Sequence, residues 1–116
     1  MAFTIATWNI NSVRLREGLV SRLMREEAPD VLCLQECKAP VESIPLEGFR
    51  SLGYGHMVAR GQKGYNGVAI LSKHPLREVG AHDFVDLGHA RHIAAAFENG
   101  VTIHNFYVPA GGDIPD

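Results

Sequence analysis

The chain has 116 residues, of which 46% are hydrophobic and 21% are charged. These values are typical of one soluble globular domain, and they exclude disordered, collagen-like and coiled-coil proteins. The formal net charge of −2 excludes a generally polybasic nucleic-acid binder, so any contact with DNA has to come from a local group of basic residues.

The first part of the chain predicts a strand, a helix and a second strand. β-branched and aromatic residues in Phe3–Asn9 predict the first strand. Asn11 or Ser12 is then positioned to cap an amphipathic helix, which Pro29 ends because the residue before a proline avoids the helical region. The apolar positions of this helix are Leu15, Leu19, Val20, Leu23 and Met24. The nearly continuous apolar run Asp30–Glu36 predicts a strand buried on both faces.

The second part of the chain predicts further strands. Tyr54–Arg60 and Gly67–Ser72 are strand-like segments within regions rich in glycine and proline. His92–Glu98 and Val101–Val108 flank Asn99 and Gly100, a dipeptide that favours a two-residue type I′ hairpin turn. One helix among about six strands predicts a layered α/β fold with the helix packed on a sheet.

The localisation of the protein follows from two absences in the sequence. No apolar run approaches the roughly 20 residues of a membrane helix, and Met1–Asn9 lacks the pattern of a signal peptide. We therefore expect a cytoplasmic protein without membrane contact, in which Cys33 and Cys37 are free thiols. The chain closes on a run of Pro, Gly and Asp residues that leads to no further element, which suggests the N-terminal portion of a longer domain.

Polar residues stand where three predicted strands end. Asn9 follows the first strand, Glu36 follows the second, and Asn105 and Tyr107 lie on the last. Catalytic groups concentrate at such positions, because the sheet fixes the backbone while the strand ends stay open to solvent. A single glutamate after an apolar strand suits Mg²⁺, which takes oxygen ligands and uses only one or two carboxylates. For each residue taken alone, a strand-end cap is the favoured explanation, and it is the shared placement of the residues that favours a site.

Two other segments have composition typical of ligand sites. The glycine-rich loop Gly61–Gly67 contains Lys63, and its exposed amides suit a phosphate, although a surface turn explains the same composition. The cluster of His82, Asp83, Asp86, His89 and His92 offers zinc ligands, but no regular helical or hairpin frame imposes tetrahedral order. We therefore do not assign a zinc site to this cluster.

Four segments together resemble the exodeoxyribonuclease III family of DNA-repair nucleases, within the exonuclease, endonuclease and phosphatase superfamily. They are Thr7–Arg14 (TWNINSVR), Pro29–Lys38 (PDVLCLQECK), Gly61–Lys73 (GQKGYNGVAILSK) and Asn105–Asp113 (NFYVPAGGD). The resemblance implies a four-layer α/β sandwich of two packed mixed β-sheets flanked by helices, of which residues 1–116 are the N-terminal half. It also implies a cytoplasmic enzyme of bacterial type, dependent on Mg²⁺ or alternatively Mn²⁺, with 3′–5′ exonuclease and abasic-site endonuclease activity on duplex DNA.

The resemblance further assigns roles to individual residues. Asn9 and Tyr107 would be catalytic, and Glu36, with Asn9, would bind the metal. The expected DNA contacts are Lys38, Tyr65, Asn66 and Arg91. Two positions depart from the family pattern, since Ala90 replaces the usual glycine before Arg91 and Ala110 replaces a polar residue after Tyr107.

The family pattern requires a second half that these residues do not contain. We therefore expect residues 1–116 alone to be inactive, to need the missing C-terminal half as a partner, and to leave apolar residues such as Val31, Leu34 and Ile93 exposed. Two alternatives to the nuclease remain at this point. One is a phosphatase or phospholipid diesterase of the same superfamily, and the other is a truncated, non-catalytic DNA-binding module.

Overall fold

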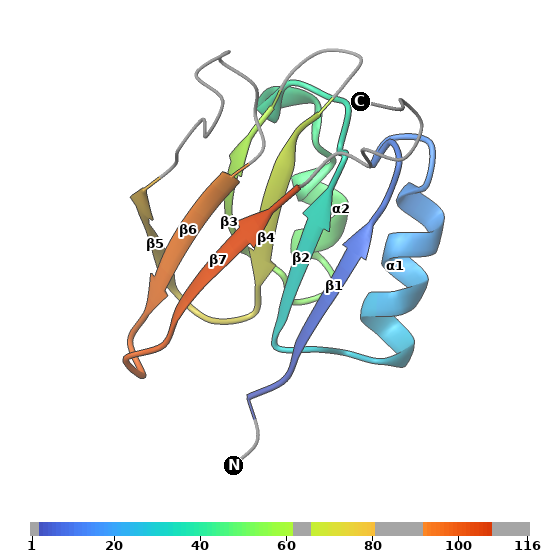
Figure 1. Ribbon diagram of the computed structural model, residues 1–116. Coiled ribbons are helices and arrows are strands. Elements are labelled where there is room, and N and C mark those ends of the chain that lie inside the picture. Colours follow the sequence, from blue (N-terminus) through green and yellow to red (C-terminus); the bar gives the residue numbers. More distant parts are fainter. Residues whose placement is uncertain (1–2, 62–65, 81–91, 108–116) are drawn as a thin grey trace, which may run out of the picture.

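The computed structural model describes residues 3–61, 66–80 and 92–107, which form two β-sheets and a layer of helices (Figure 1). In chain order the elements are β1 (Ile5–Asn9), α1 (Glu17–Glu26), β2 (Val31–Gln35), the 3-10 helix η1 (Val41–Ser43), α2 (Leu46–Arg50), β3 (His56–Arg60), β4 (Val68–Ser72), β5 (Leu76–Gly80), β6 (His92–Phe97) and β7 (Thr102–Phe106). Both α-helices lie on the face of the first sheet that points away from the second sheet (Figure 1). The described residues thus form three layers of the predicted four-layer α/β sandwich.

The first sheet, sheet A, is mixed and has the strand order β1-β2-β4-β3. β1 runs parallel to β2, whereas β4 runs antiparallel to both β2 and β3. In this register Asn9 lies beside Gln35, and Gln35 lies beside Val68. The ends of β1, β2 and β3 and the start of β4 therefore meet at one end of the sheet, which we call the site end. The other end, where β2 begins and β4 finishes, is called the opposite end.

The second sheet, sheet B, has the order β5-β6-β7 and is antiparallel throughout its described strands. β7 crosses in front of β2 and β4, while β5 lies over β3 (Figure 1). Among the described strands, β1 is thus the outermost strand of sheet A and β7 the outermost strand of sheet B on the same side of the molecule.

Two hydrophobic clusters separate the three layers. Val20 and Met24 of α1 and Phe49 of α2 pack against Leu32 and Leu34 on one face of sheet A. On its other face, alternate residues pack against sheet B, and this cluster consists of Val31, Cys33, Val68, Ile70, Ile93, Ala95, Phe97 and Ile103. The expected exposure of Val31, Leu34 and Ile93 is wrong: all three are fully buried, because this stretch of chain supplies both sheets and its own helices.

The predicted helix begins later than expected. Asn11 and Ser12 both have positive φ, at 50° and 87°, so the chain makes a turn before α1 starts at Glu17. Ser12 accepts a hydrogen bond from the Leu15 amide, but it does not cap the helix. Leu15 is 80% exposed and Leu19 is 50% exposed, so neither is a core residue.

The structure also contains elements that the sequence did not predict and a different hairpin turn. The prediction of a single helix is wrong, since α2 is present, and β5 was also missed. The predicted two-residue turn is wrong as well. Phe97 donates its amide to Val101, and Gly100 has φ of 90°, so the loop contains three residues with glycine in the left-handed position. Among the described residues, no helix is long and apolar enough to cross a membrane.

Candidate functional site

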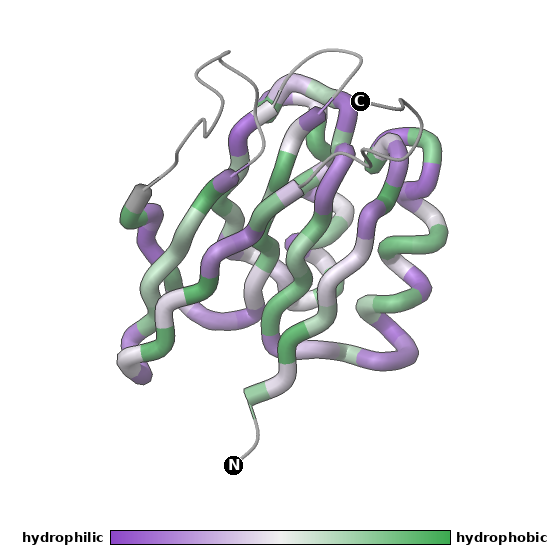
Figure 2. Tube along the Cα trace, viewed as in Figure 1, coloured by the Kyte–Doolittle hydropathy of each residue, from purple (hydrophilic) through white to green (hydrophobic). Residues whose placement is uncertain are grey.

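Polar residues gather at the site end of sheet A. Figure 2 shows hydrophobic residues along β2 and β4 and hydrophilic residues where β1 and β2 end. Gln35 is the last residue of β2, and Glu36 follows it directly. Because β1 pairs in parallel with β2, Asn9 reaches the same end one strand away. The structure therefore places Asn9 and Glu36 at the same end of sheet A, on neighbouring strand ends.

The segment that follows β2 is held on both sides by backbone hydrogen bonds. The amides of Ser12 and Val13 donate to the carbonyls of Glu36 and Cys37, at 2.8 and 3.0 Å. On the other side, the Cys37 amide donates to Gly67, at 3.0 Å, and the Lys38 amide donates to Asn66, at 2.7 Å. The backbone of residues 36–38 is therefore fixed between two loops, and the side chains of Glu36 and Lys38 project from a rigid frame.

Unusual backbone conformations concentrate in this frame. Of the six non-glycine residues with positive φ in the described part of the chain, Ala28 lies elsewhere, and the other five are Asn11, Ser12, Glu36, Lys38 and Asn66. Left-handed conformations cost free energy in residues with a side chain, and they persist where the surrounding structure imposes them. Such clusters are typical of functional sites, where they aim particular side chains.

Two glycines in the described part of the chain pack closely against the segment that follows Glu36. A Cβ atom on Gly61 would overlap the Ala39 carbonyl oxygen and lie 2.7 Å from the Val41 nitrogen. Gly67 has φ of 98°, and a Cβ there would lie 3.2 Å from the Lys38 nitrogen. Only glycine fits these positions without displacing the backbone, so the chain at Gly61 and at Gly67 is packed tightly against residues 37–41.

A basic side chain lies beside the Glu36 carboxylate. Lys38 Nζ lies 4.0 Å from Glu36 Oε1 and donates a hydrogen bond to Asn11 Oδ1 at 2.5 Å. Both charged side chains keep contact with solvent, with 32% of Lys38 and 23% of Glu36 exposed. Lys38 also borders a polar hollow of about 570 Å³, whose other lining residues are Ser12, Arg14, Leu15, Glu17, Ser43 and Pro45. Two cations at one hollow provide the local basic surface that a phosphate ester requires.

The remaining predicted site residues fall into two groups. Tyr107 follows β7 and packs against the cluster between the sheets. Asn66 lies beside Lys38 and is only 6% exposed. Tyr65 and Arg91, like the predicted histidine and aspartate cluster before His92, lie outside the described residues. The predicted roles of all these residues remain predictions.

Asn11 is a site residue that the sequence analysis missed. It was considered only as a helix cap, but its side chain accepts the hydrogen bond from Lys38 and its backbone carbonyl accepts one from Arg16 at 2.6 Å. The signal was available in the sequence, since Asn11 stands two residues after Asn9 in the same motif. Its contact with Lys38, 27 residues away, became evident only with the fold.

The donor set at the site end suits a hard divalent cation. Glu36 offers a carboxylate, and Asn9 and Asn11 offer amide oxygens, which are the ligand types that Mg²⁺ selects. Within the described residues, no group of three or more His, Cys, Asp or Glu side chains gathers in the way a transition-metal site requires. Glu36, Asn9 and Asn11 therefore fit one part of a magnesium site.

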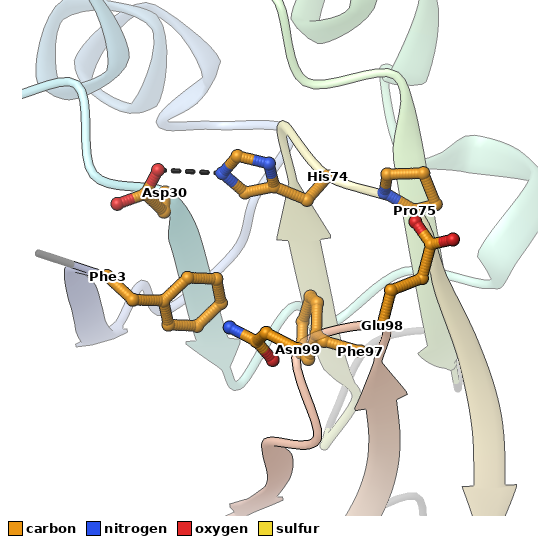
Figure 3. A pocket seen from close by; sticks show the side chains of 7 residues that line it. All are labelled: Phe3, Asp30, His74, Pro75, Phe97, Glu98 and Asn99. Carbon is orange, nitrogen blue, oxygen red and sulfur yellow. Dashed lines mark hydrogen bonds and ion pairs between the residues drawn. The ribbon is translucent and has the colours of Figure 1, made fainter. Parts of the chain in front are cut away.

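A second hollow lies at the opposite end, between the two sheets (Figure 3). It measures about 360 Å³ and is lined by Phe3, Asp30, His74, Pro75, Phe97, Glu98 and Asn99. His74 Nε2 lies 2.7 Å from Asp30 Oδ1, and the Thr4 amide and hydroxyl donate to Asp30 Oδ2 at 2.8 and 3.0 Å. The hydrogen bond with His74, followed by those from Thr4, lowers the pKa of Asp30 to about 2. This carboxylate is engaged in joining three segments of the chain, which is a structural role.

Comparison with known proteins places this arrangement in a family. The endonuclease/exonuclease/phosphatase family matches residues 6–115, and the chain belongs to this family. It is homologous to exodeoxyribonuclease III and to AP endonucleases. The exodeoxyribonuclease III of Haemophilus influenzae is 42% identical over 67 residues, which cover 58% of this chain and 25% of that protein.

Solved structures agree with this assignment. An AP endonuclease from Archaeoglobus fulgidus superposes with a TM-score of 0.84 at 38% identity, over 93% of this chain and 42% of that one. A 3′ phosphatase from Neisseria, solved with a product DNA hairpin, superposes with a TM-score of 0.80 at 38% identity, over 91% of this chain and 41% of that one. The chain spans less than half the length of each of these relatives, and the two-sheet fold is the one they share.

Proposed function

We propose that this chain is the N-terminal half, residues 1–116, of a Mg²⁺-dependent DNA-repair phosphodiesterase of the exodeoxyribonuclease III type. The substrates proposed are duplex DNA with abasic sites and duplex DNA with 3′ ends. The observation that carries the proposal is the Glu36 carboxylate, held at the site end by a fixed backbone and placed beside Lys38. A carboxylate for a metal and a cation for a phosphate are two of the components that phosphodiester cleavage needs at one place.

The proposed division of roles follows the family resemblance and is compatible with the positions of the described residues. Glu36 and Asn9 would hold the metal, with Asn11 beside them as a further oxygen ligand or as the partner that orients Lys38. Bound Mg²⁺ would supply charge stabilisation on the phosphoryl oxygens. Tyr107 would contact the scissile phosphate, while Lys38, Tyr65, Asn66 and Arg91 would contact the DNA backbone. Mn²⁺ is expected to replace Mg²⁺, because it also accepts oxygen ligands.

The second half of the domain has a defined place to join. Among the described strands, β1 and β7 are the outermost strands of sheets A and B on the same side of the molecule (Figure 1), and we propose that strands of the second half extend both sheets on that side. Apolar side chains exposed on or next to these edges include Ile5, Leu19 and Phe106, at 50%, 50% and 46%. The described residues supply no complete metal site, so we propose that residues 1–116 alone do not cleave DNA. The complete protein is proposed to act in the cytoplasm of a bacterium.

The test compares three DNA substrates and one control. The complete protein is incubated with a duplex carrying one abasic analogue, a duplex with a recessed 3′ end and a duplex with a 3′ phosphate, with Mg²⁺ or with EDTA, and inositol phosphate serves as the control. Cleavage of the abasic or recessed duplex only with Mg²⁺ supports the proposal. Hydrolysis of inositol phosphate in preference to DNA would show a phosphatase, and tight DNA binding without turnover would show a binding module.

A further inference from the structure

A buried polar layer lies directly beneath the candidate site. The face of sheet A toward sheet B is apolar along β2 at Val31 and Cys33, but the next residue on that face is Gln35. The facing residue of β7 is Asn105, which follows Ile103 on the same face. Asn105 is 2% exposed and Gln35 is 9% exposed, so two amide side chains are placed within an apolar interface.

The two amides satisfy each other and reach both sheets. Gln35 Nε2 donates to Asn105 Oδ1 at 2.7 Å and to Thr7 Oγ1 at 2.9 Å. Asn105 Nδ2 donates to the carbonyl oxygens of Leu34 and Ala69, at 3.0 and 2.8 Å. β1, β2, β4 and β7 are therefore connected by one set of hydrogen bonds. Removing one member deprives its buried partners of a hydrogen bond, and leaving a buried polar group less well satisfied costs more than the bond itself contributes.

The members of this layer stand next to the proposed site residues along the chain. Thr7 precedes Asn9 by two residues, so the two share one face of β1. Tyr107, which directly follows β7, comes two residues after Asn105 and packs against the cluster between the sheets. Gln35 immediately precedes Glu36. β1, β2 and β7, the strands that lead to the proposed site residues, are thus joined to one another by hydrogen bonds one or two residues before the site.

We propose that Gln35 and Asn105 are positioning residues that hold Tyr107 of sheet B in register with Glu36 and Asn9 of sheet A. The inference rests on the proposed function. Neither amide touches the reacting atoms, and both act through the strand ends. An apolar pair would fill the interface equally well, but van der Waals packing lets two sheets slide, whereas directional hydrogen bonds to the Leu34 and Ala69 carbonyls fix where β7 stops.

The test uses three variants of the full-length protein. Asn105→Ala breaks the layer, and Ile103→Ala is the matched control, because it removes buried volume from the same strand face without touching the amides. The double variant Gln35→Met with Asn105→Leu replaces both amides by apolar side chains of similar size, so neither amide is left without the other, and the bonds to Thr7 and to the Leu34 and Ala69 carbonyls are lost. It keeps the proposal testable even if Asn105→Ala fails to fold.

Cleavage of bound abasic duplex is measured in single turnovers at saturating Mg²⁺, together with the Kd for the same duplex in EDTA. We expect Asn105→Ala and the double variant to cleave about 10- to 100-fold more slowly with an unchanged Kd, and Ile103→Ala to cleave at the wild-type rate below its melting temperature. A rate within twofold of wild type for the double variant, or an equal loss in Ile103→Ala, overturns the proposal.

A second readout does not depend on nuclease activity. The protein is labelled with 3-fluorotyrosine, and the resonance of Tyr107 is identified from its loss in Tyr107→Phe. We expect this resonance to shift or broaden in Asn105→Ala and in the double variant but not in Ile103→Ala. If wild-type protein does not cleave abasic duplex, the proposed function fails, and the fluorine spectrum alone decides the positioning role: an unchanged Tyr107 resonance in both amide variants overturns it.

Discussion

The two ends of sheet A hold their polar groups in different ways. At the opposite end, Asp30 receives hydrogen bonds from Thr4 and His74, and Tyr54 donates from its hydroxyl to Pro29 at 2.6 Å. At the site end, Glu36 and Lys38 stay 4.0 Å apart and partly exposed, while the backbone of residues 36–38 is hydrogen-bonded to the chain on both sides. The opposite end engages its carboxylate in joining distant segments, whereas the site end fixes the backbone, engages Lys38 with Asn11 and leaves the Glu36 carboxylate available to a ligand.

The largest effect is expected at Glu36. In the complete protein, Glu36→Gln keeps the shape of the side chain but removes its charge, so Mg²⁺-dependent cleavage should fall by more than about 100-fold. The melting temperature should change by less than about 2 °C, because the side chain joins no other segment. Glu42→Gln, on the exposed surface of η1, is the control and should leave both values unchanged. Near-normal cleavage by Glu36→Gln at saturating Mg²⁺ would contradict the assignment.

The close packing at the site end can be tested at Gly61. Gly61→Ala places a methyl group against the backbone of Ala39 and Val41, so the free energy of unfolding should fall by about 1–3 kcal/mol. Gly18→Ala is the control, because nothing lies within 4 Å of the new Cβ and alanine favours α1. It should raise the free energy of unfolding by up to about 1 kcal/mol in denaturant titrations. Equal stability of the two variants would show that the backbone of residues 39–41 moves readily to make room for the new methyl group.

Asp30 tests whether the opposite end is purely structural. Asp30→Asn should lower the free energy of unfolding by about 1–2 kcal/mol at neutral pH, a value reduced because the carboxylate is partly exposed. The folded pKa of Asp30, about 2, lies below its ordinary value of 3.8, so its contribution is present above pH 4 and is lost as pH falls toward 2. Wild type and variant should converge over this range in acid titrations, with an unchanged cleavage rate at neutral pH.

Tyr54 should give the smallest effect. Tyr54→Phe removes only the hydroxyl that donates to Pro29, so the buried ring stays in place and the free energy of unfolding should fall by about 1 kcal/mol. Thermal and denaturant unfolding both measure this loss. If cleavage falls while stability holds, the two ends of sheet A are not independent.

The sequence predicted those parts of the fold that depend on short-range patterns. The apolar run before Glu36 indicated a buried strand because both faces of β2 are covered, and the polar residues at the strand ends marked the site end. α2 escaped detection because it has only five residues and contains Gly48, and β5 has no apolar alternation that separates it from a loop.

The parts that were missed depend on contacts between distant residues. Gln35 and Asn105 are separated by 70 residues, and their hydrogen bond depends on how sheet B lies over sheet A. The positive φ of Glu36 and Lys38 likewise results from the loops on either side, since neither residue type favours that conformation. The residue types in the sequence indicated which side chains could bind a metal or a phosphate. The orientation of each side chain depends on the packing around it, which the sequence pattern does not show.

The buried cysteines have a consequence for resistance to oxidative damage. Burial raises the pKa of Cys33 to about 11 and that of Cys37 to about 12, so both remain protonated at neutral pH. Peroxides and alkylating agents react with the thiolate, which neither residue provides while the protein is folded. Cys37 lies in the backbone segment that carries Glu36, so a sulfenic acid or a disulfide there would displace the residues that we assign to the metal. Because Cys37 is fully buried, such reagents have no access to its sulfur while the protein is folded.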